Sequence, residues 1–247
     1  MKKSTRYSFA GLMAAGLVSV VSLAHAYPAI DAAIWPSFYG MEYAAPRIVV
    51  DQAMQAQMRA DLLRNAEAAT SAARSFYGTF HRRPYLVACS TEACDHKMGG
   101  RGPKGMAYTT PLATVIRLSP RDINETILTH EFSHVELGTK VSLWAQITGA
   151  FPIWFDEDVA VVVSDDSQFL NPGASAAERC VRNTEEPLPT KYSDWGPRTG
   201  KDPMLYADAA CRVLQWMEAN GGTAGLLKTL NAMDHGMVFT PENRRRS

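Results

Sequence analysis

The stretch His130-Glu131-Phe132-Ser133-His134 decides how this chain is interpreted, because it brings two imidazoles and a carboxylate into little more than one turn of a helix. Side chains four residues apart lie on the same helix face, so both histidines can reach one ion. Glu131 is rotated by about 100° from His130, and it therefore addresses a water on that ion rather than the ion itself. The motif predicts a metal site, provided that its surroundings are helical.

The residues around the motif favour such a helix. Ser119 can cap it, Pro120 suits its first position, and Asp122 favours its positive N-terminal end. Apolar residues and the two histidines then recur at spacings of three and four up to Leu137. Gly138 offers a stop. The sequence thus predicts one helix whose core-facing side carries the metal ligands.

Downstream of the motif lies a possible third ligand, which a zinc hydrolase needs together with an open position for water. The extended pattern H-E-x-x-H-x-x-G-x-x-H is excluded, because Leu137 and Lys140 stand where it requires Gly and His. The other common solution is a glutamate on the next helix. Residues 151–160 supply one, since Pro152 can start a helix and Glu157 follows the motif after enough chain for a turn and an antiparallel return.

These two segments together resemble the gluzincin metallopeptidases, the peptidase MA-like domains of the thermolysin clan. The second segment of that family reads P-x-W-F-x-E-G-x-A. Five residues of this chain match it: Pro152, Trp154, Phe155, Glu157 and Ala160. Asp158 stands where the family has Gly, so that Asp156 and Asp158 are alternative ligands to Glu157. The resemblance covers roughly residues 50–235, but only the two motifs are specific.

The resemblance implies a zinc-dependent peptidase acting on a peptide or protein substrate. His130, His134 and Glu157 would hold Zn²⁺. Glu131 would take a proton from the bound water and later pass it to the leaving amine. Tyr206 is the expected donor to the oxyanion of the tetrahedral intermediate, because gluzincins commonly use a Tyr or His downstream of the glutamate helix.

Other interpretations compete with a peptidase. The chain can be a catalytically inactive relative that keeps the fold as a peptide- or protein-binding module, and Asp158 in place of Gly keeps this open. It can be a zinc amidase acting on cell-wall material. It can also be a structural protein in which His130 and His134 are merely buried.

The role of Tyr206 also has an alternative. Tyr206 can be a core tyrosine that starts an amphipathic helix, and His235 is then the alternative oxyanion donor.

The resemblance implies an α+β fold with a single zincin-like domain, in which a helix and a small mixed sheet precede a mainly helical half carrying both motifs. Composition and periodicity predict a helix over residues 51–77 and strands over residues 85–89 and 114–118. By the same family analogy, residues 114–118 form the edge strand along which a peptide pairs. The glycines within residues 95–105 predict a loop.

The sequence divides the chain into three parts. Residues 1–26 are typical of a signal peptide, residues 27–50 predict an N-terminal arm, and residues 51–247 form the expected domain, with a long loop over residues 165–203. In the first part, basic residues precede an apolar stretch, and Ala24-His25-Ala26 suits cleavage before the following tyrosine. An uncleaved anchor is the alternative. We expect a periplasmic or secreted protein without stable membrane insertion.

The composition excludes several classes of protein. Of 247 residues, 46% are hydrophobic and 20% charged, which is unlike a disordered chain, a collagen-like repeat or a disulfide-dense miniprotein. Lys and Arg number 25, as do Asp and Glu. Because a nucleic-acid binder would normally show a basic excess, no nucleic-acid partner is expected.

The four cysteines predict disulfides, because an even number in an exported protein favours pairing. Proximity in sequence favours Cys89–Cys94 and Cys180–Cys211. The alternative is a metal site that uses Cys89, Cys94 and His96.

Overall fold

The computed structural model describes residues 27–78, 80, 82–110, 113–121, 123–235 and 237–239. The predicted signal peptide lies outside these residues. The described part is an α+β structure, as expected from the resemblance, but its contacts divide it into two compact units instead of one domain. The first unit comprises the chain up to Arg59 together with Pro84–Asp122, and the second comprises Ala60–Arg83 together with the chain from Ile123 onward.

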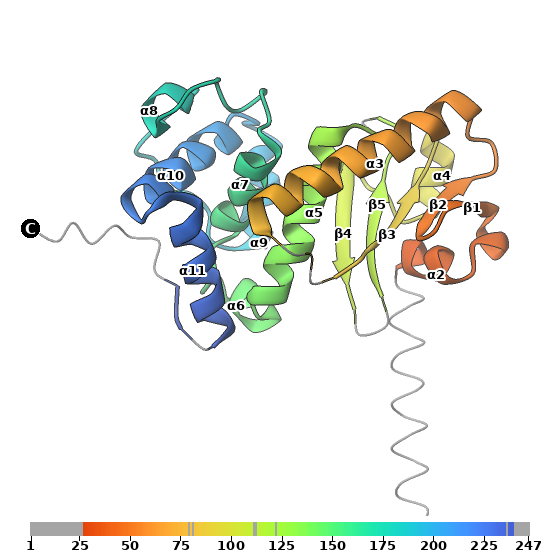
Figure 1. Cartoon of the computed structure of the whole chain (residues 1–247), viewed down its shortest axis with the longest axis horizontal. Coiled ribbons are helices and arrows are strands. Elements are labelled where there is room, and N and C mark those ends of the chain that lie inside the picture. Colours follow the sequence, from red (N-terminus) through yellow and green to blue (C-terminus); the bar gives the residue numbers. More distant parts are fainter. Residues whose placement is uncertain are drawn as a thin grey trace, which may run out of the picture. The chain divides into compact units, whose positions relative to one another are not determined.

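The first unit contains a five-stranded mixed sheet in the order β1-β2-β3-β5-β4 (Figure 1). Its strands are β1 (Met41–Ala45), β2 (Ile48–Asp51), β3 (Tyr85–Ala88), β4 (Gly105–Thr109) and β5 (Thr114–Leu118). The three central strands β2, β3 and β5 are parallel, whereas each edge strand is antiparallel to its neighbour. The strands predicted over residues 85–89 and 114–118 are thus confirmed as β3 and β5.

Two predictions about this unit were wrong. Residues 27–50 do not form an arm but α2 (Pro28–Ile34), a 3₁₀ turn (Pro36–Tyr39) and the first two strands. Their elements are too short to show a period, yet Ile30 packs with apolar residues of the sheet in one core. The segment 114–118 is not an edge strand, because β4 pairs with its outer side and all of its residues are buried.

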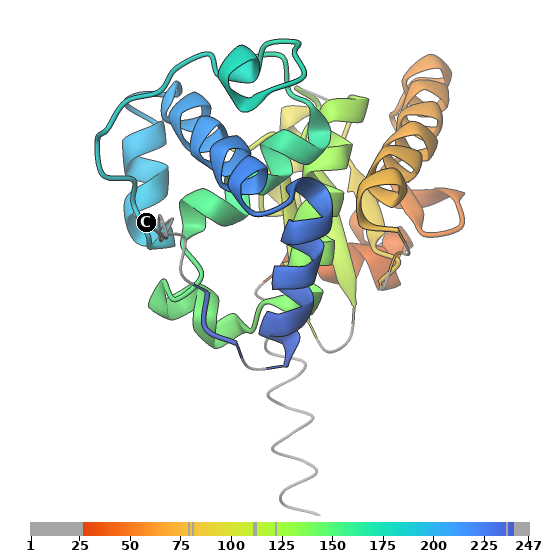
Figure 2. The same ribbon diagram turned by 60° about the vertical axis from the view of Figure 1, so that its left-hand side comes forward.

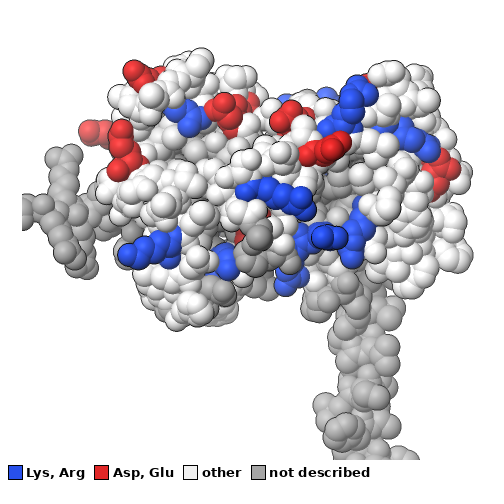
Figure 3. Space-filling view, in the orientation of Figure 1, with Lys and Arg blue, Asp and Glu red and all other residues white. Residues whose placement is uncertain are grey.

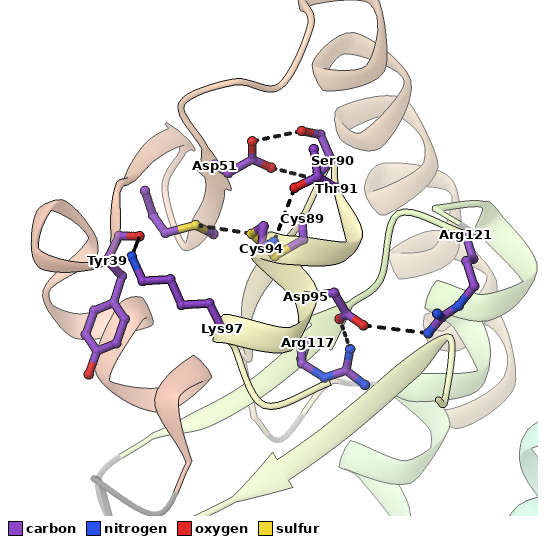
Figure 4. The surroundings of a disulfide bond; sticks show 11 residues. Tyr39, Asp51, Cys89, Ser90, Thr91, Cys94, Asp95, Lys97, Arg117 and Arg121 are labelled. Atoms are coloured by element: carbon purple, nitrogen blue, oxygen red, sulfur yellow. Dashed lines mark hydrogen bonds and ion pairs between the residues drawn. A yellow bond between two sulfur atoms is a disulfide. The ribbon is translucent and has the colours of Figure 1, made fainter. Parts of the chain in front are cut away.

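The segment predicted as a glycine-rich loop is partly regular. It begins inside α4 (Glu92–Lys97) and ends where β4 starts at Gly105. The first residue of this segment, Asp95 of α4, forms a buried ion pair in which Arg117 of β5 is the donor (Figure 4). Arg121 approaches the other oxygen of Asp95 at 3.6 Å.

The helix predicted over residues 51–77 is α3 (Ala56–Tyr77). Four of its side chains are buried at alternating spacings of four and three, which is the period of a helix face: Leu62, Ala66, Ala69 and Ala73. The three alanines among them allow close packing of neighbouring elements.

The second unit is built from helices. After α3 they are α5 (Glu125–Lys140), α6 (Leu143–Thr148), α7 (Ile153–Ser164), α8 (Ala176–Arg179), α9 (Tyr192–Thr199), α10 (Leu205–Ala219) and α11 (Gly222–Asp234). Figures 1 and 2 show α7 beside α5 and α10. An aromatic cluster forms part of the core, in which Phe155 packs on Phe151, Trp216 and Phe239. The long loop predicted over residues 165–203 contains α8 and α9.

Both predicted disulfides are present. Cys89–Cys94 lies in the first unit, and Cys180–Cys211 ties the residue after α8 to α10 in the second. The alternative metal site is excluded, because Cys89 and Cys94 are bonded to each other. Two disulfides are typical of a protein in an oxidising, extracellular environment.

None of the helices within the described residues has both the length and the apolar character required to cross a membrane. Basic and acidic side chains both occur on the surface seen in Figure 3, as expected from their equal numbers in the sequence.

Candidate metal centre

The helix that carries the HExxH motif is α5, but its ends differ from those predicted. Its N-cap is Asn124, whose side chain accepts a hydrogen bond from the backbone N–H of Ile127 at 2.9 Å. Ser119 cannot serve, because it is fully buried directly after β5, where its N–H bonds to the carbonyl of Lys104. The helix also continues through Gly138 to Lys140. The predicted helix therefore exists, with a later start and a later end.

The helix that carries Glu157 is α7, which follows α5 after the short α6. It begins where the sequence predicted, since Pro152 is its N-cap and Ile153 its first residue. Trp154 and Phe155 are buried in the aromatic core and fix the orientation of the first turn. Because α7 packs against α5, Glu157 faces the two histidines.

The ligand atoms of three residues approach one another as they would around one ion. His130 Nε2 and His134 Nε2 are 3.1 Å apart. Glu157 Oε2 lies 3.8 Å from His130 Nε2, and its Oε1 lies 3.9 Å from His134 Nε2. Ligands about 2.0–2.1 Å from Zn²⁺ at tetrahedral corners are separated by about 3.3 Å. The three residues therefore fit a zinc ion, and no other group of three His, Cys, Asp or Glu among the described residues converges in this way.

The charges around the histidines favour a cation. Burial lowers the pKa of His134, but the charge of Glu157 and the contact with Asp156 outweigh it and raise this pKa to about 10. For Glu157, burial alone would raise the pKa. The two histidines outweigh this effect, so the pKa of Glu157 is lowered. The two shifts share a cause, because the charge of Glu157 raises the pKa of His134 and the charge of His134 lowers that of Glu157. A divalent cation can replace the proton that the metal-free site would hold.

The three neighbouring acids on α7 have different surroundings. Asp156 lies against the other ring nitrogen of His134, with Oδ1 3.5 Å from Nδ1, which is the position of a carboxylate that orients a metal-bound histidine. Asp158 is fully buried, its two oxygens have no hydrogen-bond partner, and burial together with Glu157 and Asp208 raises its pKa. Among the three acids, only Glu157 belongs to the converging group.

The predicted general base, Glu131, lies on α5 between the two histidines of the motif. Its side chain is largely buried, and its charge contributes to the raised pKa of His134. In the same turn of the helix, the hydroxyl of Ser133 is 2.6 Å from that of Tyr77 on α3. Burial raises the pKa of Tyr77, which keeps it a neutral phenol.

The predicted oxyanion donor, Tyr206, lies at the start of α10 with its hydroxyl directed at the third ligand. Its Oη donates to Glu157 Oε2 at 3.2 Å and accepts from Trp195 Nε1 at 3.2 Å. Burial and the charge of Glu157 raise the pKa of Tyr206. His235, the alternative donor, is exposed at the end of α11.

Sequence analysis did not find Trp195 or the contact between Asp156 and His134. Trp195 lies in a segment predicted to be a loop, and the only signal was a large aromatic residue within a polar stretch. Asp156 was recognised only as an alternative ligand, because adjacent acids on one helix cannot be told apart without their orientation.

Comparisons with protein-family models, with curated proteins and with solved structures found no match. The gluzincin resemblance therefore depends on the two motifs and on the convergence of the residues that they contain.

Proposed function

We propose that the protein is an exported zinc-dependent metallopeptidase that hydrolyses peptide bonds in a peptide or protein substrate. The observation that carries the proposal is the convergence of His130, His134 and Glu157, whose ligand atoms all lie within 4.8 Å of one another. Three protein ligands with an open fourth position are typical of catalytic zinc sites, whereas structural sites use four protein ligands.

Zn²⁺ bound by these residues would polarise the scissile carbonyl and lower the pKa of its bound water to about 7. In the proposed reaction Glu131 takes the proton of that water and then delivers it to the leaving amine. Asp156, whose Oδ1 lies 3.5 Å from Nδ1 of His134, would orient that side of the ring, so that the lone pair of Nε2 would be available to the ion.

An inactive peptide-binding relative is less well supported than an enzyme. That interpretation depended on Asp158, which stands where the family has Gly and would add a negative charge beside the proposed ligand. Asp158 is outside the converging group, and its raised pKa favours the neutral form. The replacement therefore removes no group that the proposed reaction needs.

Metal analysis combined with activity measurements tests the proposal. We expect about one zinc per chain in freshly purified protein, and cleavage within a diverse peptide pool. Glu131→Gln should keep the zinc and lose turnover by about 10²- to 10⁴-fold. Glu125→Gln is the matched control, because Glu125 is an exposed residue in the first turn of the same helix.

Two results would overturn the proposal. One is freshly purified protein without metal. The other is zinc-loaded protein that cleaves no peptide in the pool. A parallel assay on peptidoglycan fragments then identifies a cell-wall amidase, if those fragments are hydrolysed in a Glu131-dependent manner.

A further inference from the structure

We infer that Tyr206 and Trp195 are positioning residues that fix the carboxylate of Glu157 as the third metal ligand. The inference deepens the proposed function and rests on it. Its basis is a chain of two hydrogen bonds, from Trp195 Nε1 to Tyr206 Oη at 3.2 Å and from Tyr206 Oη to Glu157 Oε2 at 3.2 Å.

The direction of these hydrogen bonds follows from the chemistry of the groups. An indole N–H can only donate, and a carboxylate can only accept. The hydroxyl of Tyr206 must therefore accept from Trp195 and direct its single proton to Glu157. The hydrogen bond fixes the orientation of the carboxylate, with Oε2 3.8 Å from His130 Nε2 and Oε1, which receives no proton from Tyr206, 3.9 Å from His134 Nε2. Ligation through one oxygen would keep the fourth metal position open for water.

The rings of Tyr206 and Trp195, which form these two hydrogen bonds, are held rigidly by their neighbours. Tyr206 stacks on Phe169 with ring centroids 5.1 Å apart, and it meets the edge of Trp195 at 5.0 Å. Trp195 is only 2% exposed. Phe169 and Trp195 both belong to the segment of residues 165–203 that was predicted to be a long loop. That segment thus supplies the support of the third ligand.

The same two hydrogen bonds argue against a role of the Tyr206 hydroxyl as the oxyanion donor. A donor to an oxyanion needs an O–H bond that points at the substrate oxygen, whereas the O–H of Tyr206 is directed at Glu157. The two roles predict different results when the hydroxyl is removed. Loss of a positioning residue weakens metal binding, while loss of an oxyanion donor lowers turnover and leaves metal binding unchanged.

The experiment compares zinc affinity between wild type and two variants by competition with a chromophoric chelator. Tyr206→Phe keeps both ring contacts and removes the hydroxyl, and we expect zinc to bind about 10- to 100-fold more weakly. Trp195→Phe removes the indole donor, and we expect a smaller loss of about 2- to 10-fold. The visible spectrum of the Co²⁺-substituted protein should change in both variants, because the orientation of a ligand changes.

The matched control is Tyr77→Phe, which deletes a tyrosine hydroxyl that bonds to Ser133 instead of to a ligand oxygen. It should lower thermal stability while leaving zinc affinity and the Co²⁺ spectrum unchanged. Circular dichroism and thermal unfolding show whether each variant is folded, and Trp195→Phe provides a second variant if Tyr206→Phe does not fold.

Three results would contradict the inference. Unchanged zinc affinity and Co²⁺ spectrum in folded Tyr206→Phe, with a lower kcat, would assign the hydroxyl to the oxyanion. An equal loss of affinity in Tyr77→Phe would indicate general destabilisation. Wild-type protein without metal would refute the proposed function itself, and this result is distinguishable because it appears before any variant is made.

Discussion

The two units each contain a buried cluster of charges, and the clusters differ in their balance. In the first unit Asp95 is met by Arg117 and Arg121 (Figure 4). Arg117 also donates to the carbonyl of Pro103 at 3.2 Å. In the second unit, the carboxylates around His134 raise its pKa to about 10. The first cluster is neutralised by the chain's own cations, whereas the second needs a proton or a metal ion.

The comparison shows that buried charge alone does not identify a functional site. Both Asp95 and Arg117 are about 1% exposed, more deeply buried than the three proposed metal ligands. The two clusters differ in whether the buried charges are neutralised by opposite charges of the protein itself. Only an incomplete set is expected to bind a ligand. Four experiments probe the two units, and the first and third of them test this distinction directly.

The largest effect is expected when the balanced cluster is broken. Arg117→Met leaves the buried carboxylate of Asp95 without its main partner, and we expect the free energy of unfolding to fall by about 3–5 kcal/mol in urea titrations. Adding Asp95→Asn, which preserves the shape beside Gly100, should recover much of that loss. Zinc bound per folded chain should not change, and a fall would mean that the two clusters are coupled.

The disulfides of the two units provide the next comparison. Cys180 and Cys211 are 31 residues apart in sequence, whereas Cys89 and Cys94 are 5 apart. The chain-entropy model assigns about 3–4 kcal/mol to the longer loop and about 2 kcal/mol to the shorter one. Replacing each pair by alanine should therefore destabilise the protein more at Cys180 and Cys211. Thermal unfolding of the two double variants measures this, and the opposite order would contradict it.

A pH titration separates the metal-free centre from the balanced cluster. The pKa of His134 in the folded protein, about 10, is above its ordinary value of 6.5. Its contribution to stability is therefore complete below pH 6.5 and is lost as the pH rises to about 10. In urea unfolding of chelator-treated protein, stability should fall by up to about 1.4 kcal/mol per pH unit in this window.

The zinc-loaded protein is the control for that titration. The ion replaces the proton on His134, so this loss should disappear, and zinc binding itself strengthens as its ligands lose protons. If the stability of the metal-free protein is constant or rises between pH 6.5 and 10, the description of the site as an incomplete set of charges is wrong.

The smallest effect is expected at Gly138, within the helix that carries the histidines. Its φ angle is not in the left-handed region, and a Cβ added there would meet no atom within 4 Å. Gly138→Ala should stabilise the protein by about 0.5–1 kcal/mol, because it restricts the unfolded chain and improves helix propensity. Thermal unfolding measures this gain, and unchanged zinc affinity would show that the centre tolerates a stiffer helix.

Strong local patterns made parts of the structure predictable. The spacing of His130 and His134 predicted a helix, Pro152 predicted the start of α7, and the proximity of cysteines predicted both disulfides. The convergence of Glu157 with the histidines agrees with what the gluzincin resemblance implied.

The remaining features depend on contacts that no local pattern contains. Ser119 and Asn124 are both plausible helix caps in the sequence, and the burial of Ser119 decides between them. β4 begins at the last glycine of the glycine-rich stretch, and its strand character comes from pairing with β5. Trp195 acquires its position only when α9 packs near Tyr206.

The bond between Cys180 and Cys211 has a consequence for when the protein matures. It ties the segment after α8 to α10, the helix that begins with Tyr206. Thiols remain reduced in the cytosol, so this tie forms only after the chain reaches an oxidising compartment. We therefore expect the newly made chain to be a latent form that secures its metal poorly. The proposed hydrolytic activity would then arise only after the chain has left the cytosol.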